Sequence, residues 1–208
     1  PQKISELDLA SIRLDLEQML KSSKVPQALL FTGSRGTGKT SAARIVAKAI
    51  NCLNNFKNKD DFEPCNICEQ CVSITRGNNL DILEIDAASN RGIEDIRDLR
   101  EKIKLAPVGA KYKVYIIDEV HMLTTEAFNA LLKTLEEPPG HAVFILCTTD
   151  SEKLPETIIS RCLRFNFKRG TLGELVEKMR KIADLESVVR PGVERSRAKA
   201  GVENIPTG

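Results

Sequence analysis

Residues 33–40, Gly-Ser-Arg-Gly-Thr-Gly-Lys-Thr, fit the phosphate-binding pattern G-x-x-x-x-G-K-[ST] at every fixed position. Residues 28–32 before them are a short apolar run typical of a buried strand, and residues 41–50 after them carry apolar side chains at helical spacing. A strand, a glycine-rich loop and a helix in this order point backbone N–H groups at one place, with the positive end of the helix behind them. The pattern therefore predicts a nucleoside-triphosphate site rather than a glycine-rich turn that binds nothing.

Two carboxylates follow another apolar run, residues 114–117, and complete the expected site. Asp118 would hold hydrated Mg²⁺, and Glu119 would orient and deprotonate the attacking water. Acidic residues after a strand are often only solvated turn residues, but the phosphate loop upstream favours the catalytic interpretation. Lys39 would reach the β- and γ-phosphates, and the Thr40 hydroxyl would ligate Mg²⁺. The residues expected to contact the nucleotide are Gly33, Ser34, Arg35, Gly36, Thr37, Gly38, Lys39, Thr40 and Ser41.

The overall charge does not indicate a nucleic-acid partner, because 31 basic residues nearly balance 29 acidic ones in the 208-residue sequence. No apolar run approaches the length needed to cross a membrane, and residues 1–7 do not form an apolar signal segment. We therefore expect a cytoplasmic protein with no membrane partner, in a compartment where thiols stay reduced.

Strand-like and helix-like patterns alternate along the chain, which predicts an α/β fold with a parallel sheet covered by helices on both faces. Residues 1–7 are expected to be extended, Asp8 to cap the first helix, and the tail beyond about Leu185 to be poorly ordered. The five expected strands are residues 28–32, 81–85, 114–117, 143–148 and 163–167, and the main helices are residues 9–20, 41–51, 93–103, 127–135, 155–161 and 172–185.

Four of the six cysteines lie within 20 residues, at Cys52, Cys65, Cys68 and Cys71. The two-residue spacings let neighbouring thiolates converge on one ion, and the longer spacer lets Cys52 complete a tetrahedron. Structural Zn²⁺ suits four thiolates best. An iron–sulfur cluster, a site with three ligands, or cysteines that are merely small buried residues remain alternatives. The other two, Cys147 and Cys162, are expected to lie in the core.

In combination, these motifs resemble the tau/gamma ATPase subunits of the bacterial DNA polymerase III clamp loader, a family of AAA+ proteins. The resemblance covers residues 28–167 and implies a five-stranded P-loop AAA+ domain with an inserted zinc module. The matching segments are residues 31–41, 84–89, 113–123, 128–139, 148–150, 153–155 and 160–162, together with the four cysteines.

The resemblance also implies roles that the bare motifs do not. Thr149, rather than Thr148, would be the sensor between the two carboxylates and the γ-phosphate. Arg161, in Ser-Arg-Cys, would be a catalytic finger inserted into the nucleotide site of a neighbouring subunit. Without the resemblance, Arg161 would be interpreted as an ordinary basic helix end.

Members of this family form a spiral that tracks the backbone of primer–template DNA, and they act with other clamp-loader subunits on the sliding clamp. The positions that match the DNA contacts are Asn90 and Arg91, before the helix that begins at Ile93, and Thr157 in the short helix near Arg161. Helix N-termini suit phosphates because their N–H groups are unpaired. Each position could equally be a solvent-exposed turn with a capping residue.

The resemblance divides the chain into an AAA+ nucleotide-binding domain, residues 1–167 with the zinc module at 52–71, and a partial lid helix with a tail, residues 168–208. Two departures stand out. The family's basic, tryptophan-containing segment before Pro1-Gln2 is not seen in the sequence, and Asp8-Leu9 replaces a Gly-Gln pair. Beyond Phe167-Lys-Arg169, only the first lid helix is recognisable, in a truncated or divergent form.

The expected function is that of an ATPase motor subunit, with ATP, Mg²⁺ and Zn²⁺ as its cofactors, within the DNA polymerase III holoenzyme, a nucleotidyltransferase. The first alternative is a non-hydrolysing subunit similar to the delta-prime protein, which has the zinc module but typically lacks a working phosphate loop. The second is a zinc-dependent DNA-binding module. Acidic residues around the cysteines disfavour it, among them Asp60, Asp61, Glu63 and Glu69.

Overall fold

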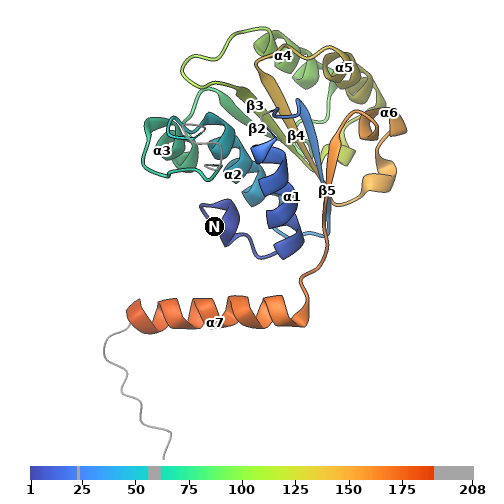
Figure 1. Ribbon diagram of the computed structural model, residues 1–208. Helices are drawn as coiled ribbons and strands as arrows, with labels where there is room; N and C mark the ends of the chain where they lie inside the picture. The colour runs from blue at the N-terminus through green and yellow to red at the C-terminus, as the bar shows by residue number, and fades with distance from the viewer. Residues whose placement is uncertain (23, 56–61, 190–208) are drawn as a thin grey trace, which may run out of the picture. The chain divides into compact units, whose positions relative to one another are not determined.

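Five parallel strands form one sheet in the order β2-β3-β4-β1-β5, which confirms the predicted α/β fold (Figure 1). This computed structural model describes residues 1–22, 24–55 and 62–189. Each observed strand lies within about one residue of its predicted range. The strands are β1 (Ala28–Gly33), β2 (Ile82–Asp86), β3 (Lys113–Asp118), β4 (Ala142–Thr148) and β5 (Leu163–Phe167).

Helices cover the two faces of the sheet separately, and each face has its own apolar core (Figure 1). Successive side chains of a strand point to opposite faces of the sheet. Along β1, Leu29 and Phe31 therefore pack in one core, and Ala28 and Leu30 pack in the other. The first core contains α1 (Ala10–Lys21) and α2 (Lys39–Asn51). The second contains α4 (Ile93–Ile103), α5 (Thr125–Glu136) and α6 (Glu156–Ile159).

The N-terminal residues differ from the prediction. Instead of an extended lead-in, Ile4–Glu6 form a 3₁₀ turn, and Ile4 and Leu7 are buried in the core between α1 and α2. The expectation that Asp8 caps the first helix is wrong, because Leu9 occupies the N-cap position. Burial of apolar residues, rather than side-chain capping, therefore fixes how the chain enters α1.

The cysteine region contains a helix that the sequence pattern did not predict, α3 (Glu69–Arg76). It begins directly after Cys68 and buries Gln70, Cys71 and Ile74. Its eight residues make about two turns and include only two aliphatic side chains, Val72 and Ile74, which is too few to give a clear apolar periodicity.

Residues Pro1–Gly170 form one compact unit, and the described residues from Thr171 onward belong to a second. In the second unit, α7 (Leu172–Val189) extends past the predicted end at Leu185. The rest of the expected tail, residues 190–208, lies outside the described residues. Within the described chain, no helix is both long and apolar enough to span a membrane.

Asp81 was expected to begin the second strand, but β2 begins one residue later and Asp81 instead anchors a distant loop. Its carboxylate is only 3% exposed and accepts N–H bonds from Val108, Gly109 and Ala110 at 2.8–2.9 Å. Burial alone would raise the pKa of Asp81, but these three donors, with Lys113, hold it below its usual value. Asp81 thereby fixes the loop between α4 and β3.

We predict that Asp81→Asn lowers the free energy of unfolding by about 2–3 kcal/mol at neutral pH, because the amide cannot accept all three N–H bonds as an anion does. Since the folded-state pKa of Asp81 is depressed, its contribution is complete above the unfolded value of about 3.9 and disappears as pH falls through the folded value. Urea unfolding of both proteins between pH 7 and pH 3 measures this, with the exposed Asp98→Asn as control. A stability difference that does not shrink with acid would contradict it.

Candidate functional site

The glycine-rich loop leads directly from β1 into α2, as the motif predicts. Gly36 and Gly38 have φ values of 80° and 90°, in the left-handed region that favours glycine. Gly38 is the N-cap of α2, and its carbonyl accepts the N–H of Ala42 at 2.8 Å. The first N–H groups of α2 are therefore available at the end of β1, where an anion would bind.

Gly33 is required by a close approach of two strands. Its φ is 149°, and a Cβ at this position would lie 2.2 Å from the carbonyl oxygen of Phe167. Gly33 and Phe167 are also register partners in the pairing of β1 with β5. Glycine is therefore required at position 33 by the close approach of β5, in addition to its place in the phosphate loop.

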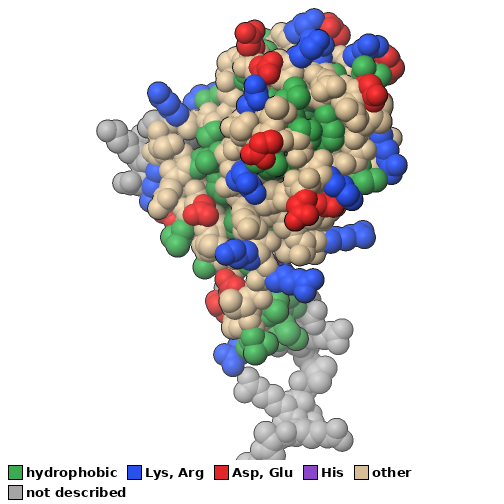
Figure 2. Space-filling model, turned by 90° about the vertical axis from the view of Figure 1, so that its right-hand side faces the viewer, with side chains coloured by type: hydrophobic (Ala, Val, Ile, Leu, Met, Phe, Trp, Pro, Cys, Tyr) green, Lys and Arg blue, Asp and Glu red, His purple; other side chains and the backbone are tan. Residues whose placement is uncertain are grey.

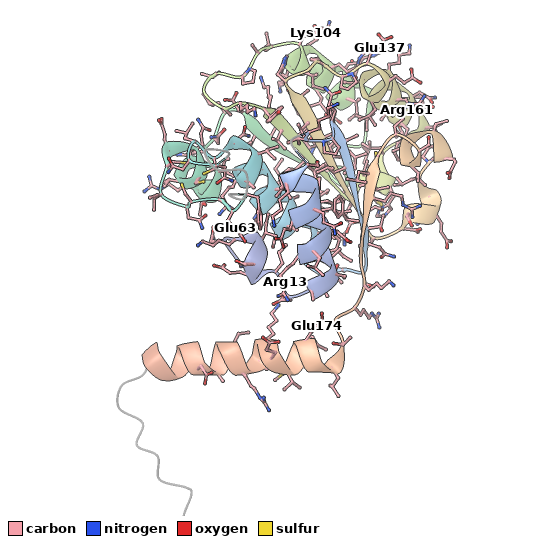
Figure 3. The ribbon with its side chains drawn as sticks, viewed as in Figure 1. Arg13, Glu63, Lys104, Glu137, Arg161 and Glu174 are labelled. Carbon is pink, nitrogen blue, oxygen red and sulfur yellow. The ribbon has the colours of Figure 1, made fainter. Side chains whose placement is uncertain are left out.

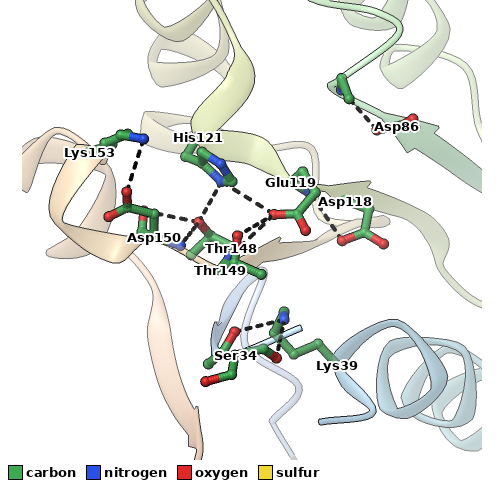
Figure 4. Close-up of polar contacts among 12 residues, drawn as sticks. Ser34, Lys39, Asp86, Asp118, Glu119, His121, Thr148, Thr149, Asp150 and Lys153 are labelled. Carbon is green, nitrogen blue, oxygen red and sulfur yellow. Dashed lines mark hydrogen bonds and ion pairs between the residues drawn. The ribbon is translucent and has the colours of Figure 1, made fainter. Parts of the chain in front are cut away.

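Lys39 is 6% exposed, and its ammonium group is held by the loop itself (Figure 4). Nζ donates to the carbonyl oxygens of Gly33 at 2.8 Å and Ser34 at 3.0 Å. The cation is thereby placed on the inner side of the loop, where it can exchange these carbonyls for phosphate oxygens.

The two carboxylates at the end of β3 meet the phosphate loop. The Thr40 hydroxyl donates to Asp118 Oδ2 at 2.7 Å, and the N–H of Glu119 donates to Asp118 Oδ1 at 2.9 Å. Glu119 has a left-handed backbone, with φ 47° and ψ 44°, which is uncommon for a residue with a side chain. Strained residues of this kind concentrate at functional sites.

The end of β4 supplies two threonines with different surroundings (Figure 4). The Thr149 hydroxyl donates to Glu119 Oε2 at 2.9 Å, and the Thr149 N–H lies 3.3 Å from the same oxygen. Thr148 is fully buried, and its hydroxyl lies 3.0 Å from Nδ1 of His121 and donates to the carbonyl of Asp150 at 3.1 Å. The hydroxyl that faces the carboxylate pair is therefore that of Thr149.

These elements enclose a cavity of about 840 Å³, large enough for a nucleotide. The phosphate loop and the carboxylate pair expected from the sequence meet there. The end of β2 also contributes Asp86 and Ala88, which lie in the matching segment 84–89 but had no assigned role. The lining residues are Arg35, Gly36, Gly38, Lys39, Thr40, Ser41, Asp86, Ala88, Asp118, Glu119, His121, Met122 and Thr149.

His121 is a further site residue without a role in the sequence pattern. Its Nδ1 lies 3.4 Å from Glu119 Oε2 as well as 3.0 Å from the Thr148 hydroxyl. It lies two residues after Glu119, within the matching segment 113–123, but its contact with Thr148 at the end of β4 could not be deduced from the sequence.

Arg161 is not among the residues that line the cavity. Its side chain, labelled in Figure 3, donates to the carbonyl of Thr157 at 2.7 Å and to Glu136 Oε1, at the end of α5, at 2.9 Å. The structure thus places Arg161 on the surface of the first unit, held by two intrachain acceptors.

The three positions matched to DNA contacts also lie outside the cavity. Asn90 and Arg91 make short-range bonds to the carbonyls of Asp86 and Ala88, at 3.0 and 2.8 Å, and Thr157 is exposed on the four-residue helix α6. On the face shown in Figure 2, basic and acidic side chains are interspersed. These surroundings fit the capping interpretation as well as a backbone contact.

The four clustered cysteines converge, because their Sγ atoms all lie within 4.8 Å of one another. A tetrahedral ion with Zn–S bonds of about 2.3 Å separates its sulfurs by roughly 3.8 Å, so the cluster fits such an ion closely. All six cysteines are free thiols. As expected, Cys147 is buried within β4, and Cys162 packs against the core of α4, α5 and α6.

Backbone N–H groups point at the sulfurs, as in thiolate centres. The N–H of Cys65 donates to Cys52 Sγ at 3.4 Å, and the N–H of Cys68 donates to Cys65 Sγ at 3.3 Å. Burial would raise the pKa of Cys65, but the N–H groups of Ile67 and Cys68 lower it to about 6. Burial raises the pKa of Cys52 and Cys71, which a bound cation would offset.

Comparison with known proteins identifies the family. The sequence profile described as "DNA polymerase III, delta subunit" matches residues 10–171. The chain is 57% identical over 173 residues to the DNA polymerase III subunit tau of Bacillus subtilis (strain 168), which is 83% of this chain and 30% of that protein. It is 46% identical over 169 residues to subunit tau of Escherichia coli (strain K12), which is 81% of this chain and 26% of that protein. The chain thus spans less than a third of these relatives.

Solved structures show the same fold. A DNA polymerase III gamma subunit-related protein from Thermotoga maritima matches with a TM-score of 0.52 and 24% identity, over 84% of this chain and 51% of that one. A mutant of the RuvB protein from the same organism matches with a TM-score of 0.58 and 20% identity, over 90% of this chain and 55% of that one. At these identities the likeness concerns the fold alone.

Three findings agree: a profile match over most of the chain, the close identity to tau subunits, and a P-loop site at the carboxyl edge of the predicted sheet. The resemblance stated from the motifs is thereby confirmed. The chain belongs to the AAA+ family of bacterial DNA polymerase III clamp-loader subunits.

Proposed function

We propose that this chain binds and hydrolyses ATP as a motor subunit of a DNA polymerase III clamp loader, coupling hydrolysis to loading of the sliding clamp on primed DNA. The observation that carries the proposal is the hydrogen bond from the Thr40 hydroxyl to Asp118 Oδ2, at 2.7 Å. It lies beside the hydrogen bond from Thr149 to Glu119. It joins the phosphate loop to the two carboxylates that ATP cleavage needs. The alternative, a non-hydrolysing delta-prime-like subunit, is disfavoured because every fixed position of the loop and both carboxylates are present.

Each residue has a defined task in this proposal. Lys39 binds the β- and γ-phosphates, and Thr40 and Asp118 are placed to hold Mg²⁺, which neutralises charge on the phosphates when it is bound. Glu119 accepts a proton from the attacking water. Thr149 orients Glu119 through its hydroxyl, and so links the base to the γ-phosphate position.

We expect Lys39→Ala to abolish detectable Mg·ATP binding, because it removes the cation that the loop carbonyls position. Glu119→Gln should keep binding but lower turnover by about 10²–10⁴-fold, because the amide cannot accept the proton. Calorimetric titration of the 208-residue chain measures binding, and phosphate release with partner subunits and primed DNA measures turnover.

The exposed Lys133→Ala, on α5, serves as a matched control and should change neither quantity. Equal loss of ATP binding in Lys39→Ala and Glu119→Gln would remove Glu119 from its role as base. Normal ATP turnover in Glu119→Gln would do the same.

We further propose that Cys52, Cys65, Cys68 and Cys71 hold one structural Zn²⁺, supported by the convergence of their Sγ atoms. Four protein ligands leave no open coordination position, so the ion takes no part in the chemistry. Such sites couple metal binding to folding, with apparent free energies of about 10–16 kcal/mol in small zinc peptides.

Elemental analysis should therefore find one zinc per chain, and Cys68→Ser should lose most of it. Chelation should increase hydrogen exchange in the residues around the cysteines while the ATP affinity of the phosphate loop is retained. Iron in place of zinc, or no metal in freshly purified protein, would refute the assignment.

Other clamp-loader subunits are the proposed partners, with Arg161 supplied to the nucleotide site of a neighbour. Contacts of Asn90, Arg91 and Thr157 with the phosphates of primer–template DNA would be independent of sequence and weakened by salt. Exposure of Thr157 and Arg91 supports this proposal, since both side chains can be reached from outside.

An arginine supplied in trans stabilises transition-state charge, an effect of about 10³–10⁵-fold in GTPases. We predict that the isolated chain hydrolyses ATP slowly, and that the Lys39→Ala chain still accelerates hydrolysis in an intact partner subunit. Adding Arg161→Ala to that chain should remove the acceleration, while Arg164→Ala, an exposed arginine on β5, should preserve it. The measurement is the steady-state rate of ATP hydrolysis by each mixture. An equal rate with and without Arg161 would exclude Arg161 as the arginine supplied to the partner's site.

A further inference from the structure

Lys48, on α2, has an unusual environment for a lysine. It is only 2% exposed. Nζ donates to Gln2 Oε1 at 2.5 Å and Asn66 Oδ1 at 2.8 Å, with Thr75 Oγ1 at 3.4 Å. All three acceptors are neutral, and they come from the N-terminal segment, from the loop between Cys65 and Cys68, and from α3.

A buried ammonium group requires a compensating negative charge nearby. Among the residues that the structure describes, no carboxylate forms an ion pair with Lys48, and the charge of Glu6 acts on it only from beyond ion-pair distance. The acceptors instead surround the cysteine cluster: Asn66 follows Cys65, and the Thr75 hydroxyl donates to the carbonyl of Cys71 at 2.8 Å. Four thiolates around a divalent ion carry a net charge of −2, which one buried cation reduces to −1.

The same region holds the N-terminal segment (residues 1–7) at a second point. Both carboxylate oxygens of Glu63, two residues before Cys65, accept N–H bonds from Ile4 and Ser5 at 2.8 Å. Gln2, bound to Lys48, lies on the same segment, whose Ile4 and Leu7 are buried in the core with α2. The segment is therefore held by an anionic acceptor in the cysteine region, Glu63, and by a cationic donor on α2, Lys48.

We infer that Lys48 is the counter-cation of the four-cysteine metal centre, and that metal binding at this centre holds the N-terminal segment on α2. The inference rests on the proposed zinc site and goes beyond it, because it assigns a charge-compensating residue and a structural task to the centre. Residues that surround metal ligands in this way typically change metal affinity by about 10–100-fold when they are replaced.

The test compares the 208-residue wild-type chain with Lys48→Met, Glu63→Gln and the control Lys133→Met. Methionine preserves much of the volume of Lys48 without its charge but leaves its polar acceptors without their donor, so urea unfolding first establishes that the variant is folded. Zinc affinity is measured by competition with a chromophoric chelator. Hydrogen exchange of the Ile4 and Ser5 amides is measured with zinc saturating and after zinc removal.

Lys48→Met should bind zinc about 10–100-fold more weakly, and Lys133→Met should bind it as the wild type does. Zinc removal from the wild type should expose the Ile4 and Ser5 amides. Glu63→Gln should expose the same amides while zinc stays bound, with a zinc affinity within about twofold of wild type. This result would separate the contact made by Glu63 from the effect of Lys48 on zinc binding.

Lys48→Met with wild-type zinc affinity would overturn the charge assignment, and Ile4 and Ser5 amides that stay protected after zinc removal would overturn the link to the N-terminal segment. A wild-type chain that binds no zinc would refute the metal proposal and this inference together. The first two results leave the zinc site intact, so the failures are distinguishable.

Discussion

Parallel pairing of β1, β4 and β3 is the constraint on which the site depends. Thr32 of β1 pairs with Thr148 of β4, and Ile117 of β3 pairs with Leu146 of the same strand, so all three strands end at one edge of the sheet. The phosphate loop, the carboxylate pair and Thr149 must then emerge side by side. This is why the hydroxyl of Thr40 reaches a carboxylate 78 positions away in the sequence. An antiparallel strand among the three would direct one of these loops to the opposite edge.

The sequence was sufficient for the strands and the nucleotide loop because both depend on local patterns. A strand buried on two faces is a continuous apolar run, and a loop that must approach phosphate needs glycine at fixed positions. The sequence was insufficient where a contact joins residues that are far apart in the chain and belong to no recognisable motif. The donors to Asp81 lie 27–29 positions away, and the contact of His121 with Thr148 spans 27. Nothing in the local sequence of these residues distinguishes them from solvated turn residues.

The two groups expected to act on ATP are both held by intrachain partners in the isolated chain. The Glu119 carboxylate accepts from Thr149 and lies near His121, while Arg161 is paired with Glu136 on the surface. Thr149 and His121 both contact Oε2 of Glu119, so the second carboxylate oxygen can face a water molecule while Thr149 still orients the side chain. For Arg161 to reach another nucleotide, it has to leave Glu136, an exposed ion pair of the kind that contributes at most about 1 kcal/mol. Rearrangements of this size are within reach of a subunit interface, which makes assembly a physically reasonable switch for hydrolysis.

Helix α2 connects the nucleotide site with the cysteine module, and its geometry limits how they can influence each other. Lys39 and Lys48 lie nine residues apart on this helix, about 14 Å along its axis. The helix buries ten of its residues, seven of them in the apolar core, so it holds both ends in a fixed relation. The contacts at its far end are made to the N-terminal segment and to the cysteine module, not to the phosphate loop. The proposed metal centre would therefore act mainly on the cysteine region and the N-terminal segment, while the phosphate loop is positioned by β1 and β5.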